Sequence, residues 1–293
     1  MKVLLAGCTK LPAGDGDDDA LVPALADVGV HAEWAPWDSP ADFAGADLVV
    51  LRTTWDYPER LDEFLSWCDS VPNLANPVPV VRWNLDKVYL TALRDAGVPV
   101  VPTAVLRPGD RPVWPTGEFV VKPTVGAGSR GALRVAAGDF AAARAHVASL
   151  GVPVLVQPYQ ATVDVLGETA MVFFGGRYSH AFTKSAMLTP DAELDPSGHF
   201  VVERLAPAQP DAAHRRVAED VLDAAARQLG RSRSDLLYAR VDLVTGADGS
   251  PVLLELELAE PSLGFRQADE AAPARFASAV RAALSSAGPS RCP

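Results

Sequence analysis

Short apolar runs alternate with polar segments in the first part of the chain, and their lengths predict strands and a helix. We expect strands over 1–7, 31–34 and 46–52 and a short helix over 20–28. Strand, helix and strand at this spacing are typical of a parallel βαβ sheet, because parallel strands need a crossover connection. Ligands gather at the carboxyl ends of the strands in such sheets. The N-terminal part is therefore predicted to be an α/β lobe with a binding edge.

The chain changes character at the proline-rich segment 76–79, where we expect a boundary between lobes. Beyond it, apolar periodicity predicts a helix over 84–96, which Gly97 closes. The next segments are predicted as a strand (EFVVKP, 118–123), a glycine-rich loop (TVGAGSRGA, 124–132), a helix (140–150) and a buried strand (VPVLVQPY, 152–159).

The last third of the chain combines a hairpin, two helices and two apolar strands. The hairpin is expected over 167–184, with Gly175 and Gly176 at its turn. The polar loop 188–199 is a candidate mobile lid. Helices are expected over 215–229 and 270–284, and the tail 286–293 is expected to be disordered.

Three carboxylates stand on the two late apolar strands. Asp242 lies in LLYARVDLVTG, and Glu255 and Glu257 lie in PVLLELELAEPSLGF. Side chains at i and i+2 of a strand point to the same face, so Glu255 and Glu257 project together. Two such carboxylates are costly to bury unless a cation lies between them, and Mg²⁺ is the hard cation that prefers oxygen ligands. The alternative is an edge strand whose charged face meets water.

A lysine precedes the glycine-rich loop, as in many phosphate sites. Lys122 ends its strand, and Gly126, Gly128 and Ser129 follow, so an ammonium and several backbone N–H groups could surround phosphate oxygens. The spacing is not that of a P-loop, and a plain turn is the alternative. Two more lysines, Lys87 and Lys184, gain meaning beside the carboxylates. Lysines for phosphates and acids for Mg²⁺ are what a nucleotide triphosphate site requires.

Composition excludes several kinds of partner. The 293 residues are 48% hydrophobic and carry a net charge of −11 without a dense run of Lys or Arg. This argues against nucleic acid or an anionic membrane as a partner, and no stretch reaches transmembrane length. Three widely spread cysteines, an odd and sparse number, fit a cytoplasmic protein.

The segment RTTWDY, at the end of the third predicted strand, is a candidate substrate site. It places Arg52, Trp55 and Asp56 together, which is more than a helix cap needs. Arg52 could pair bidentately with a substrate carboxylate, or it could form a structural ion pair. The acidic run 17–19 is expected to be a solvated loop at a helix N-terminus, where negative charge is favoured.

Taken in order, these features resemble the ATP-grasp superfamily over about residues 80–270. The resemblance rests on Lys87, on Lys122 with its glycine loop, on LVQPY, on Arg240-Val241-Asp242 and on Glu255-Leu256-Glu257. It implies an α/β N-terminal pre-ATP-grasp lobe (1–80), then a two-lobed α+β ATP-grasp domain (81–285). The small lobe would span about 100–160 and the C-terminal lobe about 161–285.

The resemblance also implies a role for each matching residue. Lys87, Lys122 and the glycine loop would bind the phosphates of ATP, and Glu168 its ribose. Residues Gln157, Pro158 and Tyr159 would form the hinge against the adenine. Lys184 and Arg240 would be catalytic. Asp242, Glu255 and Glu257 would hold two Mg²⁺ ions, which Mn²⁺ could replace, although most members have Asn where this chain has Glu257.

Within the superfamily, four segments resemble the cyclo-ligases of D-cycloserine biosynthesis: AGCTKLPAGDGDDD, EWAPWD, LRTTWDYPERLDEF and LELELAEPSLGF. The resemblance implies phosphorylation of the carboxylate of O-ureido-D-serine and attack by its own nitrogen, giving D-cycloserine, ADP, phosphate, CO₂ and ammonia. Substrate contacts are expected at Arg52, Trp55, Asp56, Arg240 and Ser262, and a homodimer is carried over by resemblance. The alternatives are an intermolecular carboxylate–amine ligase and, more distantly, a non-catalytic nucleotide-binding protein.

Overall fold

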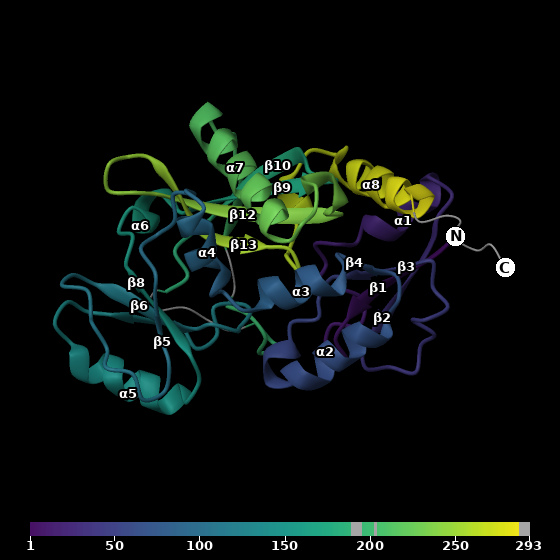
Figure 1. The fold of residues 1–293 in the computed structure, drawn as a ribbon. Helices are drawn as coiled ribbons and strands as arrows, with labels where there is room; N and C mark the ends of the chain where they lie inside the picture. Colours follow the sequence, from purple (N-terminus) through teal and green to yellow (C-terminus); the bar gives the residue numbers. More distant parts are fainter. Residues whose placement is uncertain (189–194, 202–203, 287–293) are drawn as a thin grey trace.

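Three β-sheets with flanking helices build the protein, and each sheet forms one corner of the molecule in Figure 1. The computed structural model describes residues 1–188, 195–201 and 204–286. Half of the expected lid (189–194), nearly all of the expected tail (287–293) and Cys292 lie outside these residues. The mixed α/β class predicted from the sequence is confirmed.

The N-terminal sheet is parallel throughout, as the βαβ spacing predicted. Its strands, in order across the sheet, are β2 (His31–Pro36), β1 (Lys2–Gly7), β3 (Leu48–Leu51) and β4 (Leu74–Ala75). The helical segments are α1 (Leu21–Asp27), the 3₁₀ turn η1 (Tyr57–Glu59) and α2 (Leu61–Ser70). Strand β3 is buried along its length, so its carboxyl end delivers Arg52 and the residues after it to the interior.

The second sheet is antiparallel; it and its helix lie within the residues expected to form the small lobe, and we use that name for them below. Its strands, in order, are β5 (Ala104–Leu106), β8 (Val154–Pro158), β6 (Phe119–Pro123) and β7 (Leu133–Val135). Helix α5 (Phe140–Leu150) covers it and has the predicted bounds. The Asp139 side chain caps this helix, and Gly151 ends it at a φ of 65°, which favours glycine.

The third sheet is the largest and carries the late carboxylates. Its strands, in order, are β11 (Leu205–Pro207), β10 (Arg177–Lys184), β9 (Glu168–Phe174), β12 (Tyr238–Thr245) and β13 (Pro251–Glu257). The predicted hairpin is confirmed, with Gly175 and Gly176 between β9 and β10. The other elements are α6 (Val163–Leu166), α7 (Ala212–Gln228), η2 (Arg233–Asp235), η3 (Phe265–Gln267) and α8 (Ala272–Ser286).

The single helix predicted over 84–96 is wrong. Two helices, α3 (Val78–Leu85) and α4 (Tyr89–Asp95), meet there at a break. The Lys87 backbone N–H donates to the Thr124 carbonyl at 2.8 Å, so a contact with the glycine loop replaces a helical hydrogen bond. Lys87 therefore lies on the connection between the helices, and tertiary contacts override the local periodicity.

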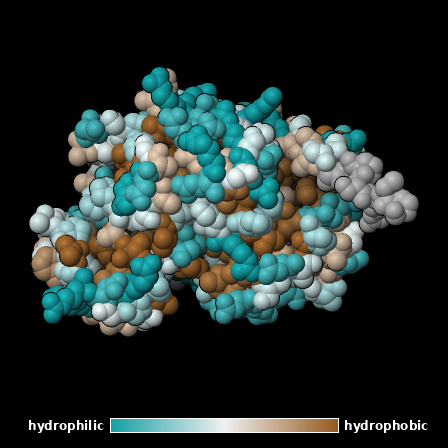
Figure 2. All heavy atoms as spheres, viewed as in Figure 1, coloured by the Kyte–Doolittle hydropathy of each residue, from teal (hydrophilic) through white to brown (hydrophobic). Residues whose placement is uncertain are grey.

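The N-terminal and C-terminal sheets share one hydrophobic core. Helix α8 packs on α1, and a cluster of buried side chains joins β1 and β3 to β9 and α8. The Asn76 side chain donates to the carbonyls of Tyr238 and Leu258 and accepts from the Leu237 N–H. In Figure 2 the upper edge, where α7 lies, is mostly hydrophilic, and hydrophobic side chains show on the small lobe. The lobe boundary expected at residue 80 stays a prediction.

Candidate active site

A cavity of about 560 Å³ lies where the three sheets meet. We call it the central cavity. It collects most of the site residues predicted from the sequence: Trp55, Lys87, Lys122, Gly126, Gly128, Ser129, Gln157, Pro158, Tyr159, Glu168, Lys184, Arg240, Glu255, Glu257 and Ser262. The sequence pattern therefore located one site built from distant segments.

Side chains from α3 and α4 hold strand β13 at the edge of its sheet. The Asn84 amide donates to the Leu256 carbonyl at 2.8 Å and accepts from the Leu258 N–H at 2.6 Å. The Tyr89 hydroxyl donates to the Leu256 carbonyl and accepts from the Leu256 N–H. An edge strand leaves backbone groups without strand partners, and these two side chains satisfy them. The strand is thus fixed with Glu255 and Glu257 on the cavity side.

Two lysines from different lobes converge on Glu255. The Lys87 ammonium lies 3.2 Å and the Lys122 ammonium 3.8 Å from its carboxylate oxygens. Burial would raise the pKa of Glu255, but the two lysines outweigh it and lower the pKa. Lys87 also donates to the Gly126 carbonyl at 2.6 Å. Two cations therefore stand beside the glycine loop, as the sequence predicted.

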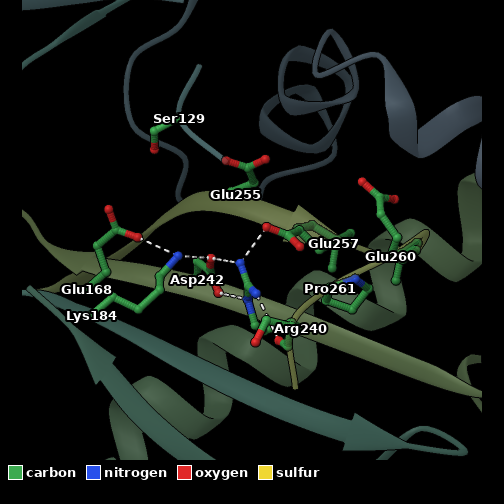
Figure 3. Close-up of polar contacts among 12 residues, drawn as sticks. Ser129, Glu168, Lys184, Arg240, Asp242, Glu255, Glu257, Glu260 and Pro261 are labelled. Atoms are coloured by element: carbon green, nitrogen blue, oxygen red, sulfur yellow. Dashed lines mark hydrogen bonds and ion pairs between the residues drawn. The ribbon is translucent and has the colours of Figure 1, made fainter. Parts of the chain in front are cut away.

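A second charged group surrounds Asp242, which is buried and bonded to Arg240 and Lys184 (Figure 3). The Arg240 guanidinium donates two hydrogen bonds of 2.9 Å to the Asp242 carboxylate, and the Lys184 ammonium lies 2.6 Å from it. Lys184 also pairs with Glu168 at 2.9 Å. Burial opposes the charge on Asp242, but Arg240 and Lys184 prevail and lower its pKa to about 2. The expected ribose ligand Glu168 is thus part of this ion-pair network.

The acid set on β12 and β13 fits a hard divalent cation. Glu255 lies directly opposite Asp242, and Glu257 opposite Arg240, so the charged side chains share one face. Burial raises the pKa of Glu257 to about 8; Asp242 and Glu255 add to the rise, and Arg240, to which Glu257 bonds, opposes it. A bound cation would relieve this repulsion between carboxylates.

No ready-made metal centre of three His, Cys, Asp or Glu side chains stands within the described part of the chain. The reason is visible in Figure 3, where Asp242 and Glu257 are turned toward Arg240. Glu255 is likewise held by lysines. Each of the three carboxylates is thus engaged by a cationic side chain.

The glycine loop (124–132) forms the rim of the central cavity and is held from both sides. The Tyr57 hydroxyl donates to the Gly126 carbonyl at 3.3 Å, and Arg130 donates to the Trp55 carbonyl at 3.1 Å. On the other side, the described part of the expected lid approaches Gly128. A Cβ there would lie 2.5 Å from the His199 carbonyl oxygen, so the contact excludes any side chain.

The residues of the predicted adenine hinge also line the central cavity. Gln157 is buried, and its amide donates to the Thr103 hydroxyl at 2.8 Å. The Tyr159 N–H donates to the Glu118 carbonyl at 2.9 Å. The Arg134 guanidinium stacks over the Tyr159 ring, 3.7 Å from the ring centroid. These contacts fix the segment, while Pro158 at the end of β8 faces the cavity.

Two of the expected substrate residues do not line the central cavity. Arg52 is fully buried and pairs bidentately with Asp18, both bonds being 2.9 Å. The expectation that 17–19 is a solvated run is wrong at Asp18, because the buried guanidinium recruits it. Asp56 accepts a hydrogen bond from Trp37 Nε1 at 2.9 Å. Both predicted residues therefore support the N-terminal lobe.

Sequence reasoning missed several polar residues of the central cavity. Tyr57 and Glu260 are among them. Glu260 follows the end of β13, so the alternation of side chains along a strand does not predict which way it points. Asp17 and Gln267 also line the cavity. Asp17 Oδ2 and Gln267 Oε1 are buried acceptors without a hydrogen-bond partner in the described structure. Only the three-dimensional meeting of the N-terminal loop and η3 reveals this pair.

Comparisons with known proteins agree with this geometry. Residues 3–78 match the family model described as the N-terminal domain of D-cycloserine synthetase DcsG. The chain is 41% identical to the cycloserine biosynthesis protein DcsG of Streptomyces lavendulae over 297 positions, which cover 94% of this chain and 96% of that protein. None of the helices described here is long and apolar enough to cross a membrane.

Solved structures give the same answer. The crystal structure of D-cycloserine synthetase DcsG matches with a TM-score of 0.87 and 39% identity, covering 97% of this chain and all of that one (100%). The ATP-grasp ligase PsnB matches with a TM-score of 0.62 at 19% identity, covering 96% of this chain and 98% of that one. D-alanine–D-alanine ligase from Bacillus anthracis matches with a TM-score of 0.62 at 15% identity, covering 98% of each chain. The last two share the fold alone. The chain is therefore an ATP-grasp ligase and belongs to the family of the D-cycloserine synthetase DcsG.

Proposed function

We propose that this ligase closes the ring of D-cycloserine by ATP-dependent activation of the carboxylate of O-ureido-D-serine. The observation that carries the proposal is the central cavity, which joins the lysine, arginine and acid set to unpartnered acceptors of the described N-terminal loop and η3. The 41% identity to a cycloserine biosynthesis protein over almost the whole chain supports the choice of substrate.

The phosphate end of ATP is assigned to the glycine loop and its lysines. Lys87 and Lys122 stand beside this loop, where their charges and the backbone N–H groups can bind phosphate oxygens. The adenine is assigned to the wall formed by Gln157, Pro158 and Tyr159. Phosphate oxygens would take over the lysines now engaged by Glu255, which frees that carboxylate.

Mg²⁺ is assigned to Asp242, Glu255 and Glu257, whose carboxylate oxygens suit it and whose mutual repulsion it would relieve. When bound, the metal neutralises phosphate charge during transfer. We propose two ions, with Mn²⁺ as a substitute. The departure from the superfamily at Glu257, which adds a negative charge, is consistent with divalent metal binding.

The amino-acid end of the substrate is assigned to the N-terminal side of the cavity. Asp17 Oδ2 and Gln267 Oε1 are buried acceptors that lack donors within the described structure, and an α-ammonium group supplies three N–H donors. Trp55 and Ser262 also line the cavity. A zwitterionic substrate would thus lie with its ammonium near Asp17 and its carboxylate toward Arg240.

The chain's own groups then explain the activation step. Arg240 is anchored on Asp242 and on the Ser262 carbonyl, so its guanidinium is oriented before the substrate arrives. It stabilises the charge of the phosphoryl group that passes to the substrate carboxylate. Lys184, held by Asp242 and Glu168, supplies a second fixed positive charge.

A substrate panel tests the proposal. ADP formation is measured with Mg²⁺ and O-ureido-D-serine, O-ureido-L-serine, D-serine or D-alanine plus an amine. We expect substrate-dependent ADP formation with the first compound above all others. Turnover only with paired amino acids and amines would instead identify an intermolecular ligase.

The homodimer stays a prediction, which light scattering after gel filtration would check.

A further inference from the structure

Glu260 is the acid of the central cavity that the phosphate and metal assignments leave unused. Glu260 is 9% exposed and lines the cavity three residues after Glu257. In Figure 3 its carboxyl is turned away from Arg240. Among the ion pairs of the described residues, none involves Glu260, whereas Glu168, Asp242, Glu255 and Glu257 are each paired with a Lys or Arg.

The backbone around Glu260 is fixed by three consecutive carbonyls. Trp55 Nε1 donates to the Glu260 carbonyl at 2.9 Å, Arg52 to that of Pro261 at 3.0 Å, and Arg240 to that of Ser262 at 2.9 Å. The donors come from the N-terminal lobe and from the phosphoryl site. Segment 260–262 therefore connects the substrate side of the cavity to Arg240, and it fixes the position from which the Glu260 side chain extends.

We propose that Glu260 is the base that accepts the proton of the attacking substrate nitrogen; the inference rests on the proposed function. The nitrogen lone pair forms the new C–N bond to the acyl carbon. The C–O bond to phosphate breaks, and its electron pair leaves with the phosphate. The proton of the N–H group passes to the Glu260 carboxylate, so ring closure is balanced without another reactant. Hydrolysis by water then removes the carbamoyl group from the ring nitrogen as CO₂ and ammonia.

The chemistry of the nucleophile explains why a base is required. A ureido nitrogen shares its lone pair with the adjacent carbonyl, so it attacks well only as it loses its proton. Acids held in tight ion pairs are poor acceptors, because their cationic partners favour the unprotonated form. Glu260 lies outside those ion pairs and lines the same cavity as Asp17 and Arg240, so no Lys or Arg in the described structure holds its carboxylate in an ion pair.

The surroundings of Glu260 tune it to neutral pH. Burial raises the pKa of its carboxyl to about 7, and Glu255 adds to the rise, while Lys87, the Tyr57 hydroxyl and Arg240 oppose it. The negative charge of Glu260 in turn contributes to the raised pKa values of Tyr238 and Cys68. A base with a pKa near the working pH can both accept and release the proton in each cycle.

The test compares Glu260→Gln with the wild type and with Glu63→Gln, a control at an exposed glutamate of α2. Acylphosphate is trapped with hydroxylamine, which attacks without a base, and D-cycloserine is measured in parallel. We expect Glu260→Gln to keep hydroxamate formation and to lose cyclisation by about a hundredfold or more. The fall of wild-type kcat below about pH 7 should disappear from the residual activity of this variant.

The outcomes separate the two claims. A wild type that gives no hydroxamate from O-ureido-D-serine contradicts the proposed function, and this inference falls with it. If the wild type is active, the inference alone is overturned when Glu260→Gln loses hydroxamate formation and cyclisation equally, or when it keeps both. Glu260→Asp retains a carboxylate and is expected to recover part of the cyclisation. This second variant keeps the inference testable even if Glu260→Gln fails to fold. If Glu260→Asp cyclises no faster than Glu260→Gln, and its kcat does not fall at low pH, the inference is also contradicted.

Discussion

The Arg52 guanidinium donates two hydrogen bonds of 2.9 Å to the Asp18 carboxylate, and both side chains are 1% exposed. The same guanidinium donates to the Pro261 carbonyl. One buried ion pair thus ties the loop after β1 and the end of β3 to the segment that carries Glu260 and Ser262. The Arg52–Asp18 pair does not line the central cavity, but it fixes the backbone of a segment that does.

Asp18→Asn should destabilise the fold, because it leaves Arg52 as a buried charge without its partner. The expected loss is about 3–5 kcal/mol of unfolding free energy, measured by urea unfolding. Asp19→Asn, at the exposed neighbouring position, serves as the matched control and should change little. Equal stability of the two variants would show that the pair does not hold the lobe.

Asp242→Asn should abolish phosphoryl transfer while the protein stays folded. Arg240 keeps Glu257 and the Ser262 carbonyl, and Lys184 keeps Glu168, so these cations retain partners. Loss of one metal ligand is expected to lower ATP turnover by about a thousandfold or more. Circular dichroism checks the fold, and Asp248→Asn, in the exposed turn before β13, is the control. Full turnover in Asp242→Asn would refute the metal assignment.

Lys122→Ala should weaken ATP binding. The lysine lies near the end of β6 beside the glycine loop, and a charge-assisted hydrogen bond contributes about 1.5–3 kcal/mol, or roughly ten- to a hundredfold in affinity. Calorimetric titration with ATP measures the change, and Lys2→Ala, on an exposed strand end, is the control. Unchanged affinity would mean that the loop does not cradle phosphates.

Trp55→Phe should impair catalysis with the amino-acid substrate and spare ATP binding. The variant loses the Nε1 donor to the Glu260 carbonyl and keeps an aromatic ring against Phe200, whose centroid is 5.1 Å away. We expect a loss of kcat/KM for the substrate of about five- to tenfold. Trp67→Phe is a fair control, since Trp67 Nε1 has no hydrogen-bond partner in the described structure. Equal effects of both variants would argue for packing alone.

Local sequence signals predicted the elements whose contacts are local. The β9–β10 hairpin and α5 form where they were expected because a Gly-Gly turn, an Asp cap and a terminal glycine specify them. The i, i+2 pattern also placed Glu255 and Glu257 correctly on one face. The superfamily resemblance assigned the lysines and acids to one site. The central cavity gathers all of them except Asp242, which is bonded to Arg240 and Lys184 of the lining.

Contacts between distant segments were beyond the reach of the sequence. The helix break at Lys87 follows from a hydrogen bond to Thr124, and no local residue signals it. For Arg52 the structural ion pair, one of the two predicted alternatives, is the one observed, but its partner Asp18 could not be named because it is 34 positions away in a run that resembles a solvated loop. Glu260 was overlooked because it follows β13. Each miss is a residue whose environment is built by a distant segment.

The central claim is that this site phosphorylates the carboxylate of O-ureido-D-serine and then closes the ring. The most direct measurement uses substrate labelled with ¹⁸O in its carboxylate, with ATP and Mg²⁺, and mass spectrometry of both products. We predict D-cycloserine together with phosphate that carries one ¹⁸O atom from the substrate. Unlabelled phosphate, or labelled phosphate without D-cycloserine, would contradict this claim.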